Sequence, residues 1–446
     1  MLRSSAIVTT MVLVCGSLAA GTFIGCSGGS ASLFYQHESP QALQRDTLGT
    51  DGRIVSTIAW PEHEANGIIK IVPVDQLERT EEVPITVPAA ATESLGDRFA
   101  ERTLNVPAGF SAEIIAWDVG KPHDIVVGPS GTLFVSDIEG GRIVAVAPDG
   151  AVTTIASGLS DPSGMTIGGN ALFYATETKL FRYDIPSGNP TSGTAKLLTD
   201  RLPSGGDFYT RAIVYRDRDK KVYVSIGVTD RIDVERDREH GTIFAVSAEG
   251  GAPKRVFLSG LRNNAGIDVH PETGDLWGVD QGLDDLAESL APDEVNILKS
   301  GGEYGNPFYY SQNLENPKFV ETKTASRPKK PTPSLIDLEP YSGASDAHFY
   351  SGSVFGEEMR NALFIVYNGY EVGAVRRADD LKTGAKVVRI NVAADGSNPM
   401  QADLFSGWLT DGDYWGRPVA IAWSQDGADF FVTDEKNRVI YRFRRP

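Results

Sequence analysis

Six segments of the sequence share one pattern: an apolar strand, a turn, a second strand rich in β-branched and aromatic residues, and a third strand. Such a unit forms a small antiparallel sheet with two apolar faces, and it cannot bury both of them alone. Arranged around an axis, the units cover one another and leave only short edges. The segments begin at His123, Pro162, Arg211, Ala265, Asn361 and Pro418.

The repeat therefore predicts an all-β fold, a six-bladed β-propeller over residues 104–446. The strand expected at 104–116 closes the ring by pairing inside the last blade. A double β-sandwich is the alternative, and the recurring turn followed by a phrase such as LFVSD favours the propeller. The 47 glycines and 25 prolines are spread along the chain as turn residues, which is typical of many short strands.

The first 26 residues resemble a secretory leader, because one arginine precedes a long apolar run and small residues follow. The phrase Phe-Ile-Gly-Cys at 23–26 resembles a bacterial lipobox, which predicts acylation of Cys26 and an exported protein, periplasmic or held at the cell surface. A plain signal peptide or an uncleaved anchor helix remains the alternative. Both cysteines, Cys15 and Cys26, lie in this leader, so the mature domain has no disulfide and no cysteine zinc site.

Residues 27–103 are expected to form a tether and an N-terminal extension. The chain carries 59 acidic against 42 basic residues, a formal charge of -17. A nucleic-acid-binding protein needs a basic footprint, which is absent here, so nucleic acid is not an expected partner.

Functional residues of a propeller gather at one mouth of its channel, on the loops that lead into the inner strands. All six such openings in this sequence contain a charged side chain. The openings are 121–124, 161–163, 206–211, 262–264, 346–348 and 415–418.

The phrases GLRNNAGIDVHPETGDLWGVDQG at 260–282 and PDEVNILKSGGEYGNP at 292–307 resemble the glucose/sorbosone dehydrogenase family. So do the phrases at 121–146 and 416–443. Members of that family are six-bladed quinoprotein propellers that use pyrroloquinoline quinone (PQQ). The resemblance covers most of 104–446, and it implies oxidation of an aldose, sorbosone or a related polyol, with electrons passed to a periplasmic acceptor.

The resemblance also implies which residues hold the cofactors. PQQ is a planar tricarboxylate, which suits guanidinium partners and flat apolar surfaces. The family's Arg-Asn pair falls on Arg262 and Asn263, its last-blade arginine falls near Arg417, and Trp415 is placed to offer a stacking face. The alternative for Arg262 is an ion pair that braces a loop.

In the family, Ca²⁺ is held partly by carbonyls of the turn that corresponds to Gly282 and Leu283. Asp293 is one of several acids near that turn, and hard oxygen ligands suit calcium. A solvated acidic loop is the alternative.

The sequence departs from the family at the catalytic base. The family's histidine falls on Asp207 or Phe208, so Asp207 is the predicted base, while His123 and His348 can also face the channel. The family's fifth-blade lysine is absent too. Two further readings therefore stay open: a propeller without redox chemistry that binds a sugar or a partner, and a metal-dependent lactonase-type propeller.

Overall fold

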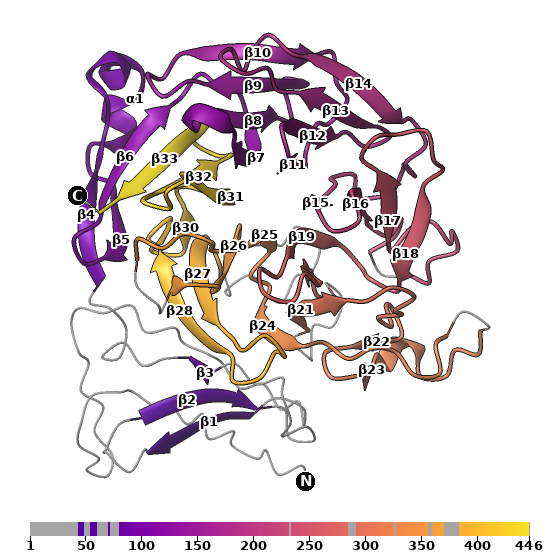
Figure 1. The fold of residues 1–446 in the computed structure, drawn as a ribbon. Helices are drawn as coiled ribbons and strands as arrows, with labels where there is room; N and C mark the ends of the chain where they lie inside the picture. The colour runs from indigo at the N-terminus through magenta and orange to yellow at the C-terminus, as the bar shows by residue number, and fades with distance from the viewer. Residues whose placement is uncertain are drawn as a thin grey trace, which may run out of the picture.

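The computed structural model describes residues 80–231, 233–283, 291–324, 327–355, 359–369 and 383–445, and the backbone of three strands at 43–48, 54–59 and 70–71. Most of the described elements are strands, and six small sheets surround a central axis (Figure 1). The inner strands contact one another in sequence around the ring, and the last contacts the first. The predicted six-bladed β-propeller is confirmed.

Each blade has four strands, numbered here from the axis outward. Blades one to three contain β7 (Pro122–Val127), β8 (Leu133–Asp137), β9 (Arg142–Val146) and β10 (Val152–Ser157); β11 (Met165–Gly168), β12 (Ala171–Ala175), β13 (Leu180–Asp184) and β14 (Thr194–Thr199); and β15 (Ile213–Arg216), β16 (Lys221–Ile226), β17 (Thr242–Ser247) and β18 (Arg255–Ser259). Blades four to six contain β19 (Asn264–Val269), β20 (Leu276–Asp280), β21 (Pro292–Leu298) and β24 (Ile336–Pro340); β25 (Ala344–Phe349), β26 (Leu363–Tyr367), β27 (Lys386–Asn391) and β28 (Met400–Phe405); and β31 (Pro418–Trp423), β32 (Asp429–Asp434), β33 (Val439–Arg444) and β6 (Ser111–Ala116).

The second strand of a blade explains why these sequences form a propeller. In β8, β12, β20 and β26 every residue is buried, because neighbouring blades cover both faces of the sheet. The apolar core accordingly lies between blades. Trp277 of blade four, for example, packs with Phe349 and Ile365 of blade five.

The ring is closed by a strand from the N-terminal side of the repeats. β6 pairs antiparallel with β33, with Glu113 opposite Arg442, as expected for this part of 104–116. The same sheet continues outward through β4 (Thr80–Thr86) and β5 (Thr103–Pro107), and Gly109, at φ +82°, lies in the turn between β5 and β6. The helix α1 (Thr92–Phe99) buries Leu95 and Phe99 against this blade.

The remaining elements lie outside the four-stranded blades. β1 (Leu43–Leu48), β2 (Ile54–Ala59) and β3 (Lys70–Ile71) extend the sheet of blade five, where β3 runs parallel to β28 (Figure 1). Two short hairpins are β22 (Tyr309–Tyr310) with β23 (Leu314–Glu315), and β29 (Leu409–Thr410) with β30 (Asp413–Tyr414). The 3-10 helices are η1 (Ala89–Ala91), η2 (Pro129–Gly131) and η3 (Pro317–Phe319).

No helix in the described part of the chain has the length and apolarity that a membrane span requires. Cys26 and the rest of the leader lie outside the described residues.

Aspartates on the inner strands link neighbouring blades. Each carboxylate accepts a hydrogen bond from a backbone N–H on the inner strand of the next blade, which holds three carboxylates near the axis. The pairs are Asp124 with Met165 at 2.5 Å, Asp268 with Phe349 at 2.8 Å, and Asp346 with Ile421 at 2.9 Å.

Candidate functional site

A cavity of about 310 Å³ lies on the axis, at the mouth where the inner strands begin. We call it the upper cavity. Loops from blades one, three, four, five and six contribute to its wall. Its polar and charged lining residues are His123, Thr210, Arg211, Arg231, Asn263, Gln281, Ser345, Asn368, Arg417 and Glu435.

Arg211 has a structural role in this wall. Its guanidinium donates to the backbone carbonyls of Pro203, Phe208, Thr210 and Glu177 at 2.7 to 3.1 Å, so its hydrogen atoms are directed to the protein. Burial is the main cause that lowers the pKa of Arg211, to about 10. The other two arginines in the lining of the upper cavity are Arg231 and Arg417.

Arg417 reaches the cavity, as the sequence predicted for the last-blade arginine. Its guanidinium donates to the Asn368 side-chain carbonyl and to the Gly369 carbonyl, the latter at 2.9 Å. Its Nε lies 3.8 Å from Glu435 Oε1, and Lys121 Nζ lies 3.4 Å from Glu435 Oε2. Glu435, the one carboxylate among the described residues that line this cavity, therefore lies between two cations.

Asn263 lines the upper cavity, whereas its neighbour Arg262 does not. Asn263 lines the cavity and donates from Nδ2 to Gln281 Oε1 at 2.9 Å. Arg262 is 3% exposed and is not among the lining residues. The backbone N–H groups of both residues donate to the buried Asp280, at 2.9 and 2.7 Å. Burial raises the pKa of Asp280 to about 7 against these bonds and the Arg262 charge.

Phe208, one of the two residues on which the family's histidine falls, lines the cavity. The guanidinium carbons of Arg231 and Arg262 lie over its ring, 5.0 and 4.9 Å from the centroid. Asp207, the predicted base, accepts from Arg231 Nε at 3.0 Å, and its side chain is 57% exposed. The structure thus brings Phe208 to the cavity wall and leaves Asp207 outside the lining.

The turn at Gly282 is held by Asp293. Asp293 Oδ1 accepts from the Gly282 N–H at 2.8 Å, and Oδ2 accepts from the Ser342 hydroxyl and the Ala344 N–H, both at 2.9 Å. These three donors take most of the acceptor capacity of one carboxylate. Asp293 therefore ties the turn after β20 to the start of β25.

The surroundings of Gly282 and Leu283 are tightly packed. A Cβ on Gly282 would lie 2.4 Å from the Pro292 carbonyl oxygen, so only glycine fits there. The Leu283 side chain is buried against Ala291 and Tyr310. Within the described residues, no group of three or more His, Cys, Asp or Glu side chains is arranged to hold a metal ion.

Trp415 lies away from the cavity. Its ring packs edge-on against Phe99 of α1, with centroids 6.3 Å apart, and Arg102 lies 5.3 Å from its centroid. Its Nε1 donates to the Gly407 carbonyl at 2.6 Å. The structure therefore does not bring Trp415 together with Asn263 and Arg417.

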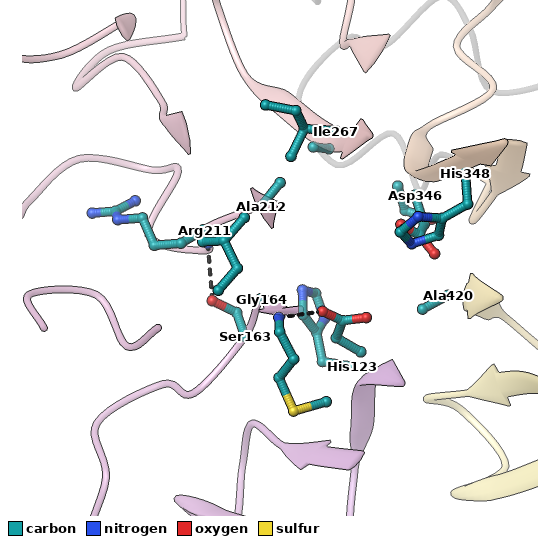
Figure 2. A pocket seen from close by; sticks show the side chains of 14 residues that line it. His123, Ser163, Gly164, Arg211, Ala212, Ile267, Asp346, His348 and Ala420 are labelled. Carbon is teal, nitrogen blue, oxygen red and sulfur yellow. Dashed lines mark hydrogen bonds and ion pairs between the residues drawn. The ribbon is translucent and has the colours of Figure 1, made fainter. Parts of the chain in front are cut away.

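A second, smaller cavity of about 30 Å³, the lower cavity, lies further along the channel (Figure 2). His123 lines both cavities, and His348 and Asp346 of β25 line only the lower one. His348 Nε2 lies 3.2 Å from Asp346 Oδ1, and its Nδ1 lies 3.6 Å from Asp268 Oδ2. The volume of the lower cavity is about that of one water molecule in the liquid.

Electrostatics in the lower cavity shift two pKa values upward. Burial opposes the charged form of His348, but Asp346 and Asp268 outweigh it and raise the pKa of His348 well above its ordinary value. Burial and then the charge of Asp346 raise the pKa of Asp124 to about 8. His348 and Asp124 therefore tend to carry protons near neutral pH.

Five polar lining residues were not predicted from the sequence: Arg231, Gln281, Ser345, Asn368 and Glu435. Three of them directly follow a second strand: Gln281 after β20, Asn368 after β26, and Glu435 after β32. Because second strands run antiparallel to inner strands, they end at the mouth where the inner strands begin. A search of the residues that follow each second strand would have found these three.

Comparison with known proteins supports the family resemblance seen in the sequence. Residues 178–398 match the family described as Glucose / Sorbosone dehydrogenase. An uncharacterized protein of Borreliella burgdorferi is 26% identical over 356 residues, which are 76% of this chain and 90% of that protein.

Solved structures share the fold at low sequence identity. The holo form of the pyranose dehydrogenase PQQ domain from Coprinopsis cinerea is 17% identical, with a TM-score of 0.59 over 77% of this chain and 98% of that chain. The PQQ-bound aldose sugar dehydrogenase from Streptomyces coelicolor is also 17% identical, with a TM-score of 0.52 over 76% and 99%. The apo soluble aldose sugar dehydrogenase from Escherichia coli is 14% identical, with a TM-score of 0.55 over 76% and 100%. The match over residues 178–398 supports the resemblance to the glucose/sorbosone dehydrogenase family found in the sequence, and the solved structures share the six-bladed fold.

Proposed function

We propose that the protein is a quinoprotein that oxidises a hydroxyl group of an aldose, sorbosone or a related polyol, with PQQ bound in the upper cavity. The observation that carries this proposal is the wall of that cavity. Arg231 and Arg417 bring two guanidinium groups to it, and three side-chain amides accompany them.

The residues present fit a planar polycarboxylate. Guanidinium groups bind carboxylates in a fixed, often bidentate geometry, and the amides of Asn263, Gln281 and Asn368 add neutral donors. A volume of about 310 Å³ lies at the small end of the range for cofactor sites, which is about 300–1,000 Å³. When bound, PQQ supplies a carbonyl group that accepts hydride from the substrate.

For calcium, the residues fit only in part. Backbone carbonyls at Gly282 and Leu283 remain the proposed ligands. Asp293 accepts three hydrogen bonds from the protein, so we assign it to holding this turn and not to binding the ion.

Reconstitution tests the proposal. The purified protein is mixed with PQQ in excess Ca²⁺, and bound quinone is followed by its absorbance. Neutral aldoses, sorbosone and polyols are then supplied with an artificial electron acceptor dye. The proposal expects a bound-quinone spectrum and dye reduction that depends on both quinone and sugar. If quinone binds but none of these substrates causes reduction of the dye, the result favours a binding module without redox chemistry.

That second function, a propeller that binds a sugar or a partner without redox chemistry, is favoured by Phe208. A phenyl ring cannot accept a proton, and it occupies the cavity wall where the resemblance gives the family's base. The binding module predicts sugar affinity that is unaffected by PQQ. Calorimetric titration of sugars with and without PQQ separates the two functions.

We further propose that the protein is exported and held at a membrane surface by acylation of Cys26. An artificial dye would then stand in for an acceptor outside the cytoplasm. One lipid-modified cysteine anchors a folded domain without a spanning helix.

A further inference from the structure

We infer that His123 is the base that takes the proton of the substrate hydroxyl, a role moved from the third blade to the first. The inference rests on the proposed function, because it concerns the same cavity and the same oxidation. It replaces the prediction for Asp207, and it deepens the proposal by naming the proton acceptor.

The upper cavity offers few groups that can accept a proton. Among its described lining residues, only His123 and Glu435 carry an imidazole or a carboxylate. Glu435 lies 3.4 Å from Lys121 Nζ and 3.8 Å from Arg417 Nε, and Asn368 Nδ2 donates to it at 3.4 Å. Both oxygens of Glu435 therefore face partners within the protein. His123 is the stronger candidate.

The third-blade opening offers no competing base inside the cavity. Phe208 fills the wall there, beneath the guanidinium groups of Arg231 and Arg262. Asp207 points its carboxylate to Arg231, and more than half of its side chain is exposed. The Asp207 carboxylate therefore faces Arg231 and solvent, and it lies outside the cavity lining.

The charges around His123 suit a base. Burial, with Lys121, lowers the pKa of His123, while Glu435 and Asp346 oppose the shift. The imidazole is therefore neutral at pH 7 and can accept a proton. Arg211, Arg231 and Arg417 also line the upper cavity, and Asp124 and His348 line the lower one. Among the described residues that line the upper cavity, Glu435 is the one carboxylate.

His123 also borders the lower cavity, which gives an accepted proton a route onward. Asp124, Asp346 and His348 line that cavity with it (Figure 2). In the reaction the substrate O–H bond breaks and its proton passes to the imidazole. The C–H bond breaks with its electron pair, which leaves as hydride to the quinone cofactor. The alcohol carbon becomes a carbonyl, so the two electrons and both hydrogens are accounted for.

The first test compares His123→Gln with Asp207→Asn in the reconstituted holoenzyme. The ratio kcat/KM of the wild type should rise with pH along a limb with its midpoint below 6.5, the ordinary value for histidine. His123→Gln should lose this limb and about 10²–10⁴ in kcat. Its PQQ affinity should stay within about twofold, since one neutral contact at most is altered. Asp207→Asn should keep the limb.

The second test does not depend on turnover. Histidine-labelled protein without cofactor is titrated by NMR, and the His123 signal is identified by its loss in His123→Gln. The signal should titrate below pH 6.5. In Glu435→Gln its midpoint should move further down, because the carboxylate raises the pKa of His123. His240→Gln, a buried histidine outside the lining of both cavities, controls for the substitution.

The outcomes separate this inference from the proposed function. If His123→Gln binds PQQ normally and its kcat/KM still rises with pH as in the wild type, the role of His123 is overturned. Loss of that rise in Asp207→Asn would overturn it as well. A His123 signal that does not respond to Glu435→Gln would contradict the electrostatic argument. Failure of the wild type to bind PQQ would instead overturn the proposed function, whatever the NMR titration shows.

Discussion

The guanidinium carbon of Arg262 lies 4.9 Å from the centroid of the Phe208 ring, and Arg262 is 3% exposed. The arginine thus supports the aromatic wall of the upper cavity from behind. This geometry lets one residue affect both the fold and the ligand site, since its charge also faces the buried Asp280.

Arg262→Ala should therefore have two effects. PQQ affinity should fall by up to roughly tenfold, because Arg262 lies outside the cavity lining and acts on the ligand through the Phe208 ring. The free energy of unfolding should fall by about 1–3 kcal/mol, because Asp280 loses its cation. Equilibrium dialysis with PQQ and urea unfolding measure the two quantities. Arg218→Ala removes an exposed arginine paired with Asp275 at 3.6 Å and serves as the control. Unchanged PQQ affinity in Arg262→Ala would remove Arg262 from the site.

The pKa of about 8 for Asp124 predicts a pH-dependent stability. The pKa of Asp124 in the folded protein lies above the ordinary value of 3.8. Its contribution to the free energy of unfolding is therefore complete below pH 3.8 and is lost as pH rises through 8. Asp124→Asn does not titrate. Its stability relative to the wild type should therefore rise between pH 5 and 8, by at most about 1.4 kcal/mol per pH unit. Urea unfolding at several pH values checks this, with the exposed Asp149→Asn as control. A constant difference would mean that Asp124 stays charged in the fold.

Asp293 is predicted to stabilise the fold without any metal. Asp293→Asn places an amide against three donors. The free energy of unfolding should therefore fall by about 2–4 kcal/mol, even in excess chelator. Ser342→Ala removes only one of those donors and should cost about 1 kcal/mol. Guanidinium unfolding in EDTA gives both values. If Asp293 served only as a calcium ligand, its replacement would be neutral or stabilising in EDTA.

The anchor at Cys26 is tested by fractionation. Cys26→Ala in the full chain should move the protein from the membrane fraction to the soluble fraction, because no acyl chains can be attached. Cys15→Ala is the matched control and should stay with the membrane. A Cys26→Ala protein that remains in the membrane fraction would indicate an uncleaved leader helix.

The fold was predictable because its signal is local and repeated. Six units with the same strand and turn pattern give six sheets, and the closing strand was predictable because 111–116 lacks partners of its own in the sequence. The turn at 270–275 follows from its PETGD phrase, and it joins β19 to β20.

The site was predictable only where a residue lies in the opening before an inner strand. Asn263 and Arg417 do, and both line the upper cavity. His348 was expected at an opening, but it lies within β25, so it lines the lower cavity. Sequence alone does not fix where a strand begins to within these few residues.

Two placements depend on contacts that are distant in the sequence. Trp415 packs on Phe99 and Arg102, which belong to the segment expected to form the N-terminal extension. The direction of Asp207 depends on Arg231, which lies in the loop between β16 and β17 of blade three.

Gly266 allows two inner strands to approach each other. A Cβ there would lie 2.5 Å from the backbone nitrogen of Ala347, so glycine lets β25 approach β19.

The central claim is that the upper cavity binds PQQ, and calorimetric titration of PQQ in excess Ca²⁺ tests it most directly. The account predicts binding of one PQQ per wild-type chain. In Arg417→Gln, where a cavity-lining guanidinium is replaced by a neutral amide, the affinity should fall by roughly tenfold or more. Absence of PQQ binding to the wild type, or equal affinities for the wild type and Arg417→Gln, would contradict it.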